Sequence, residues 1–388
     1  MSLLKTDNAI IFSNTVRGIS ASLINALVCF GFTHFNLPDE LKKFIIFFTT
    51  TNVLLIVLNW GLKDYSVKLF ASEEDTKAVF SKLFSLRLGL FIILGVTLVF
   101  VPTELELLLW ILAFTCFKII NNTVEAFATA NNKNYLFAII DIITFSLLST
   151  LCLLHLHFSI STVFIVVTLA EAIKMILGVV LFFNDLSFQL INPFVFIEET
   201  VNYFLVAFFA SLLSKVDFYI SAIYLSSKMI ANYHIYSSLI GLSQIIITAF
   251  FSRQMVNWFK TQDGYFIVNI KQFSLHTFLL SLLALPCFYF IMLYFYQFTI
   301  SFSMLVLIFF NLFIYAFTLI EIYVNTHQNK HLTILKGVFI SSLVNVGLSF
   351  LFIAYFNVLG AIIANIVSLL TLYLYFKFQN KFSNKNAT

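Results

Sequence analysis

Long apolar stretches, about twelve of them separated by short polar gaps, run through the whole 388-residue chain. Each stretch is close to the roughly 20 apolar residues that a helix needs to cross the hydrocarbon core of a bilayer. Because a membrane interior offers no hydrogen-bond partners, such stretches must be helices that satisfy their own backbone groups. The sequence therefore predicts an all-α polytopic membrane protein with about 12 transmembrane helices.

The composition excludes a large soluble domain. Apolar residues make up 61% of the chain and charged residues only 10%, whereas soluble proteins are nearer half apolar and a quarter charged. The longest polar interval between predicted spans, about 253–271, is too short to fold alone. The phosphate loop GxxxxGK[ST] is absent, and the four cysteines lack metal-binding spacing. We expect no cofactor, no metal, no nucleic-acid partner and no enzymatic activity.

The predicted spans fall into two groups of six. The first group lies near 9–31, 44–66, 85–103, 107–130, 135–156 and 160–184, and the second near 200–222, 230–252, 274–296, 301–324, 333–355 and 358–378. Two six-helix halves around a central cavity are a common plan for transporters. We therefore predict an N-terminal six-helix bundle at residues 1–190 and a C-terminal six-helix bundle at residues 191–388.

Lysine and arginine residues gather on one side of the predicted topology. With the N-terminus inside, fourteen of them, including Arg87, lie in cytoplasmic segments, and three, Lys42, Lys43 and Lys228, lie in outer loops. Because short cytoplasmic loops retain positive charge, this bias predicts that both termini are cytoplasmic. The expected location is the cell inner (cytoplasmic) membrane.

The first predicted span has one polar face. Asn14, Arg17 and Asn25 fall on it at helical spacing. Arg17 is roughly 12 Å from the cytoplasmic end of the helix, and its own helix offers no acid to neutralise it. Charges at such depth often mark a transport path. Arg17 is either a cavity cation for an anionic head group or the partner of Asp141 in an ion pair.

The fourth predicted span carries the clearest polar stripe, at i, i+3, i+4 and i+7. Its members are Lys118, Asn121, Asn122 and Glu125. Residues at this spacing share one helix face. The stripe therefore either lines a cavity or joins a buried network between helices.

Two further spans pair a lysine with an acid. Glu171 and Lys174 are three residues apart, so they can form an ion pair on one helix face. Lys215 and Asp217 are two residues apart and point about 200° away from each other. At least one member of the second pair therefore needs a partner on another helix.

The tenth predicted span also has a polar face, formed by Asn311, Tyr315, Thr318 and Asn325. Glu321 lies at the edge of this face. A carboxylate inside a membrane span can bind a proton or a cation, so Glu321 is a candidate site for a coupling ion.

Two segments resemble a known family. The segment 58–65, Leu-Asn-Trp-Gly-Leu-Lys-Asp-Tyr, is similar to the D-F-G-L type segment of polysaccharide flippases. The segment 211–236 is also similar, because Asp217 late in the seventh span precedes an outer turn and an eighth span that contains Tyr233. By these segments, its length and its number of spans, the chain resembles the repeat-unit flippases of the multidrug/oligosaccharidyl-lipid/polysaccharide exporter superfamily.

The resemblance implies a substrate, which is an oligosaccharide joined through pyrophosphate to a polyprenyl lipid. The protein would move it from the cytoplasmic to the outer leaflet by alternating access, for export of a surface polysaccharide. A deep cation suits pyrophosphate, and uncharged polar side chains suit sugar hydroxyls. Expected partners include the lipid bilayer, a glycan polymerase and export machinery. The candidate substrate-binding residues are Asn14, Arg17, Asn25, Lys118, Asn121, Asn122, Glu125, Lys215 and Asp217.

Two other functions stay open at this point. A cation-coupled multidrug exporter of the same superfamily would favour acids and aromatics in its cavity. A glycan polymerase or glycosyltransferase would carry a sizeable outer loop with catalytic acids or arginines, and the predicted outer loops here are short.

Overall fold

The computed structural model describes residues 20–385, except for gaps at 21–22, 61–65, 67–68, 71–74, 100–103, 132, 134, 155–157, 191–193, 261–269, 297–298 and 329. Within these ranges the chain forms helices and no strand. Two residues of the predicted site, Asn14 and Arg17, lie outside the described residues.

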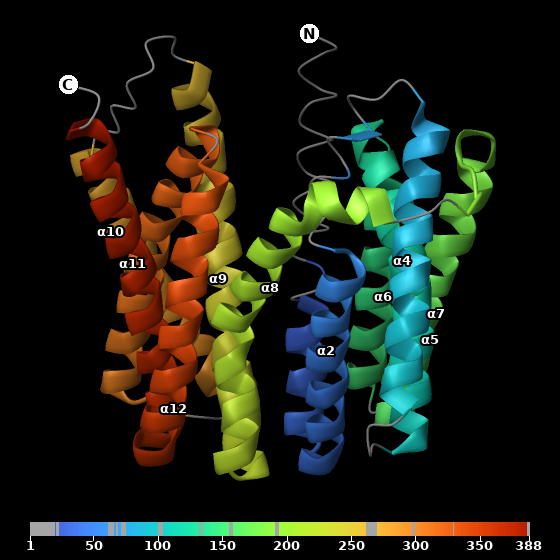
Figure 1. Ribbon diagram of the computed structural model, residues 1–388. Helices are drawn as coiled ribbons and strands as arrows, with labels where there is room; N and C mark the ends of the chain where they lie inside the picture. The colour runs from blue at the N-terminus through green and yellow to red at the C-terminus, as the bar shows by residue number, and fades with distance from the viewer. Residues whose placement is uncertain are drawn as a thin grey trace, which may run out of the picture. The chain divides into compact units, whose positions relative to one another are not determined.

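The first compact unit, unit 1, comprises residues up to Phe32 and Asp39–Phe208. Its apolar helix at Leu23–His34 is followed by α2 (Pro38–Leu58), α4 (Thr76–Val99), α5 (Leu105–Ala130), α6 (Tyr135–Leu153), α7 (Ile160–Leu181) and the short 3₁₀ turn η1 (Phe183–Asp185). In Figure 1, α4, α5, α6 and α7 run alongside one another. Helix α5 packs against α4 and α7, and α6 packs against α7.

The second compact unit, unit 2, comprises Thr33–Pro38 and the chain from Phe209 onward. Its helices are the C-terminal part of α8 (Phe194–Tyr224), α9 (Ser227–Lys260), α10 (Ile270–Phe290) with the π-helical turn η2 (Ile291–Phe295), α11 (Phe302–His327) and α12 (His331–Lys385). Helix α11 packs against α9, α10 and α12. A polar residue on α11 can therefore reach side chains of three neighbouring helices.

Nine of the described helices are long and apolar enough to cross a membrane. One of them, α12, consists of two helices joined at Asn357, which has a φ of 53°. If α12 is counted as two helices, α9 and the shorter apolar helix Leu23–His34 bring the helical segments of the described part of the chain to the expected twelve. The all-α polytopic fold predicted from the hydropathy pattern is confirmed.

The turn inside α12 depends on a glycine. A Cβ atom at Gly360 would lie only 2.0 Å from the carbonyl oxygen of Phe352. No side chain fits such an approach, because the contact is with rigid backbone. The last two spans therefore meet in a tight turn rather than in a polar loop.

The helices bury polar side chains and expose apolar ones, which is the arrangement that lipid requires. In α6, Asp141 and Thr144 are buried, whereas Ile139 and Ile143 are at least half exposed. The inward-facing polar residues of such a helix must find partners on its neighbours.

Aromatic and glycine contacts set the packing of unit 1. The ring of Phe47 on α2 lies 4.5 Å from that of Phe164 on α7 and 5.4 Å from that of Phe114 on α5. A Cβ atom at Gly178 of α7 would lie 2.7 Å from Cγ1 of Val124 on α5. The absence of a side chain at Gly178 lets α5 and α7 approach closely, and this brings their polar faces together.

Two predicted helix boundaries are wrong. Helix α4 begins at Thr76 rather than near residue 85, so Arg87 lies well inside the helix and is buried. Lys77 and Lys82, which precede the predicted start of this span, are compatible with a helix because their long side chains can reach the membrane surface. Helix α2 runs from Pro38 to Leu58 rather than from 44 to 66, since proline suits a first helical position and Trp60 has a positive φ of 51°.

Candidate functional site

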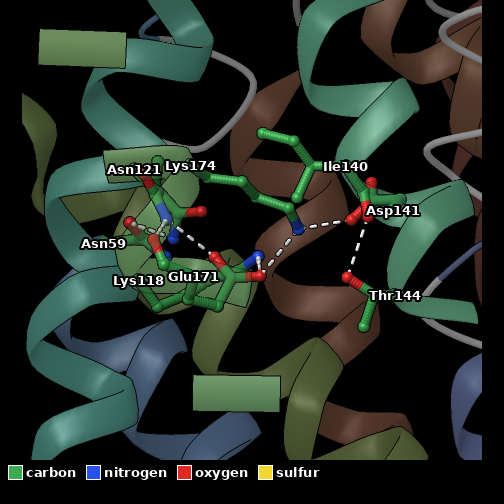
Figure 2. A network of polar contacts seen from close by, with 9 residues as sticks. Asn59, Lys118, Asn121, Ile140, Asp141, Thr144, Glu171 and Lys174 are labelled. Carbon is green, nitrogen blue, oxygen red and sulfur yellow. Dashed lines mark hydrogen bonds and ion pairs between the residues drawn. The ribbon is translucent and has the colours of Figure 1, made fainter. Parts of the chain in front are cut away.

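In unit 1, two lysines and two acids form a chain of alternating positive and negative side chains between α5, α6 and α7 (Figure 2). Lys118 Nζ donates to Oε1 of Glu171 at 2.9 Å. The same oxygen accepts a hydrogen bond from Lys174 Nζ at 2.9 Å, and Lys174 also forms an ion pair with Asp141. The Glu171–Lys174 pair predicted from their spacing is confirmed.

Two asparagines of α5 extend this network to neighbouring segments. Asn121 Nδ2 donates to the backbone carbonyl of Glu171 at 2.7 Å and to its Oε2 at 2.8 Å. Asn122 Nδ2 donates to Oδ1 of Asn59, just after α2, at 3.2 Å. Both asparagines are buried. In this conformation they belong to a buried network between helices, which is one of the two alternatives for the stripe.

The burial of the network limits what a ligand can reach. Lys118 has a 22% exposed side chain, whereas Glu171, Lys174 and Asp141 are nearly enclosed. Buried charges are stable only when they are paired and hydrogen-bonded, and the two lysines here balance the two acids. The network therefore joins three helices and leaves only the side chain of Lys118 partly exposed.

Two further predicted residues of unit 1, Asn25 and Glu125, are among the described residues. Asn25 is buried in the helix Leu23–His34, where the thiol of Cys29 donates to its Oδ1 at 4.0 Å. Glu125 is half-buried on α5.

Arg87 is a charged residue that the sequence analysis misplaced. Its Nη1 donates to Thr123 Oγ1, while Nε and Nη2 are buried without a hydrogen-bond partner. The side chain is 1% exposed. The carboxylate of Glu125 lies within electrostatic range of this guanidinium group.

Unit 2 contains a cavity of about 260 Å³ between α8, α9, α11 and α12. Its polar lining consists of Ser214, Lys215, Asp217, Tyr233, Ser237, Gln244, Asn311, Tyr315, Thr318 and Asn365. The cavity thus brings the Lys215–Asp217 segment together with the polar face of α11. The sequence had singled out both features without joining them.

Lys215 and Asp217 have different surroundings in this cavity. The Asp217 carboxyl group accepts hydrogen bonds from the hydroxyl of Tyr233 and from the backbone N–H of Phe218, the latter at 2.8 Å. Lys215 forms no ion pair and no hydrogen bond with a described residue. It lies about 14 Å from the end of α8 at Tyr224, given 1.5 Å per residue. The predicted need for a partner on another helix is met for Asp217, by Tyr233 of α9.

A chain of amides forms the opposite wall of the cavity. Gln244 Nε2 donates to Oδ1 of Asn311 at 3.0 Å, and Asn311 Nδ2 donates to Oδ1 of Asn365 at 2.8 Å. The hydroxyl groups of Tyr315 and Thr248 lie 2.9 Å apart. These bonds hold α9, α11 and α12 together and orient neutral donors and acceptors toward the cavity.

No protein-family model and no curated protein sequence matches the chain. Solved structures match nearly all of it. The lipid II flippase MurJ in an inward closed conformation gives a TM-score of 0.61 at 15% identity, covering 96% of this chain and 87% of that one. An outward-facing multidrug resistance MATE family transporter of the MOP superfamily gives 0.58 at 13%, with 96% and 97% covered. A eukaryotic MATE transporter gives 0.59 at 12%, with 97% and 96% covered. The chain has the MOP transporter fold.

In this MOP fold, Glu321 lies outside the cavity lining. Its Oε1 pairs with Lys377 Nζ at 2.8 Å, and its Oε2 accepts from Asn380 Nδ2 at 2.9 Å. Both partners are on α12, so the carboxylate links the ends of α11 and α12. The role of Glu321 as a coupling-ion site stays a hypothesis.

Several polar residues of the MOP fold were missed by the sequence analysis. Gln244 and Asn365 each stand as a lone amide in an apolar span, and an amide in hydrocarbon must find a partner. That signal was present in the sequence. No group of three His, Cys, Asp or Glu side chains that could hold a metal ion occurs in the part of the chain that the structure describes.

Proposed function

We propose that the chain is a flippase that moves a polyprenyl-pyrophosphate-linked oligosaccharide from the cytoplasmic to the outer leaflet by alternating access. The observation that carries this proposal is the cavity of unit 2, whose lining combines Lys215, which has no ion pair among the described residues, with neutral amide, hydroxyl and apolar side chains. The MOP fold along 96% of the chain supports a transporter.

The polar groups of the cavity lining suit a sugar. Each sugar hydroxyl both donates and accepts hydrogen bonds, as do the side chains of Ser237, Gln244, Asn311 and Asn365. A cavity for cationic drugs would favour acids and aromatics over basic residues. Here the single acid of the lining, Asp217, already accepts two hydrogen bonds, and the basic Lys215 stands beside it.

The pyrophosphate is assigned to the N-terminal half of the chain on sequence grounds. Arg17 is its proposed ligand, with Asn14 and Asn25 on the same helical face. The guanidinium fork matches phosphate oxygens in two hydrogen bonds at once. Lys118 is the proposed second cation, because its side chain is the exposed end of the unit 1 network, and Asn121, Asn122 and Glu125 complete the polar face of α5.

The proposed setting follows from the same substrate. The protein would lie in the cell inner membrane with both termini in the cytoplasm, and it would hand its glycan to a polymerase and export machinery at the outer face. No covalent step is needed, because the substrate leaves unchanged. Of the structural relatives, MurJ is named a lipid II flippase and the MATE proteins are named transporters.

Reconstitution into liposomes tests the proposal. A polyprenyl-pyrophosphate oligosaccharide with a fluorescent label on its sugar would be placed in both leaflets, and a membrane-impermeant quencher added outside. Without transport, about half of the label is quenched. With the protein present, we expect the rest to be quenched over time, and protein-free liposomes to keep it.

The alternative outcome is equally specific. If the labelled glycan lipid stays protected while an ion gradient drives export of a cationic dye from the same liposomes, the protein is a cation-coupled drug exporter and the flippase proposal is wrong.

A further inference from the structure

We infer that the cavity of unit 2 is a subsite for one sugar residue that carries a single negative charge, such as a uronate carboxylate, and that the ammonium group of Lys215 binds this charged group. The inference rests on the proposed function, since it names the glycan that the flippase accepts. It is built from the size of the cavity, the charge of Lys215 and the hydrogen-bonding groups of the opposite wall.

The cavity has room for only part of the substrate. Its volume of about 260 Å³ is below the roughly 300–1,000 Å³ of pockets that enclose drug-sized molecules. A whole oligosaccharide with its pyrophosphate is larger than such a molecule. The cavity therefore selects one sugar ring with its substituents.

The charge of the cavity suits a carboxylate. Lys215 presents a compact single positive charge without an ion pair among the described residues. Pyrophosphate carries at least two negative charges and is matched best by guanidinium forks. Asp217 also lines the cavity, within electrostatic range of Lys215. A second negative charge on the ligand would therefore lack a cation in this lining.

The opposite wall holds groups that fit the ring hydroxyls. Asn311 is fixed between Gln244 and Asn365, since it accepts from one and donates to the other. This arrangement leaves the side-chain carbonyl of Gln244 as an acceptor and the amide nitrogen of Asn365 as a donor, neither bonded to a described residue. A donor and an acceptor beside a cation form the set that a uronate ring requires.

Direct binding is the first test, because it does not depend on transport. Methyl glucuronide and methyl glucoside differ only in the carboxylate, and each would be added at high concentration to the purified protein. We expect the glucuronide to raise the thermal stability of the wild type, since a ligand that binds only the folded state stabilises it. In Lys215→Gln the glucuronide should have no more effect than the glucoside.

Transport of two matched lipids is the second test. Both carry the same polyprenyl pyrophosphate, and one has glucuronate where the other has glucose. We expect the wild type to transport the glucuronate lipid about tenfold better, the scale of one hydrogen bond between charged groups. Lys215→Gln should abolish this preference by lowering transport of the glucuronate lipid to the level of the glucose lipid. Lys215→Arg should keep part of it. Lys336→Gln, which removes an exposed lysine of α12, is the matched control and should behave as wild type.

The outcomes distinguish a sugar carboxylate from the pyrophosphate as the anion that Lys215 binds. They also distinguish failure of this inference from failure of the flippase proposal. An equal loss for both lipids in Lys215→Gln would assign Lys215 to the pyrophosphate and overturn the inference, while the flippase proposal would stand. A wild type without preference for glucuronate in either test would also overturn it. Failure of the wild type to transport either lipid would defeat the proposed function itself, and the inference with it.

Discussion

Replacement of Lys174 by methionine tests the physical basis of the unit 1 network. Methionine fills a similar volume without the charge, so the change removes the ammonium group that contacts Asp141 and Glu171. Glu171 keeps Lys118 as a partner. Asp141 loses its ion pair with Lys174 while the carboxylate stays 5% exposed.

The expected loss of stability in Lys174→Met arises mainly at Asp141, because Glu171 keeps a lysine partner and Asp141 does not. Breaking a buried ion pair by removing one partner destabilises a protein by about 3–5 kcal/mol, because the other charge stays buried. That range is a change of about 10²- to 10⁴-fold in the unfolding equilibrium constant. The double variant Lys174→Met/Asp141→Leu removes both charges and should regain more than half of the loss. Lys118→Met should cost only about 1.5 kcal/mol, since its side chain is partly exposed and Glu171 keeps Lys174.

Equilibrium unfolding in mixed detergent micelles, followed by circular dichroism, measures these differences. Lys336→Met serves as the control, because it removes an exposed lysine and should leave stability unchanged. A loss below about 1 kcal/mol in Lys174→Met would show that the pair is not a buried ion pair. A double variant less stable than the single one would refute the argument that the loss comes from the buried Asp141 carboxylate without its lysine partner.

Three further predictions address packing, the α11–α12 contact and topology. Gly178→Ala should destabilise the protein by about 1–3 kcal/mol, because its Cβ atom would lie 2.7 Å from Val124; Gly347→Ala, where no atom lies within 4 Å, should be neutral or stabilising in the same equilibrium unfolding assay. Glu321→Gln should cost about 1 kcal/mol, because its partner Lys377 is half exposed; a transport assay in which this variant loses its ion dependence would instead support the coupling hypothesis. In a background without native cysteines, Lys330→Cys should react with an impermeant thiol reagent only from the cytoplasmic side and Lys42→Cys only from outside; the reverse would overturn the topology.

The sequence was a good guide to the fold because lipid imposes one requirement on every span. A spanning helix must be apolar for about 20 residues, and nine of the described helices meet this requirement, so hydropathy alone predicts the fold class. Boundaries such as the start of α4 at Thr76 were less predictable. Charges were read as helix ends, although Lys77 and Lys82 lie within the helix and Arg87 is buried in it.

The candidate site was predictable only along single helices. Spacing correctly paired Glu171 with Lys174 and correctly predicted a partner on another helix for Asp217. The partner of Lys118 could not be predicted, because nothing in the sequence of α5 tells that its polar face meets α7. The cavity of unit 2 was out of reach for the same reason, since it combines four helices and two lone amides, Gln244 and Asn365.

All residues that line the cavity belong to one compact unit, and this has a thermodynamic consequence for the proposed flippase. A sugar bound there would keep the same contacts whichever leaflet the site is open to, so its binding free energy would be equal in both states. A ligand with equal affinity for two states does not shift the balance between them. The protein would then supply a path and no driving force of its own at this site. Net direction would be set by mass action, through synthesis of the glycan lipid on one side and its removal on the other.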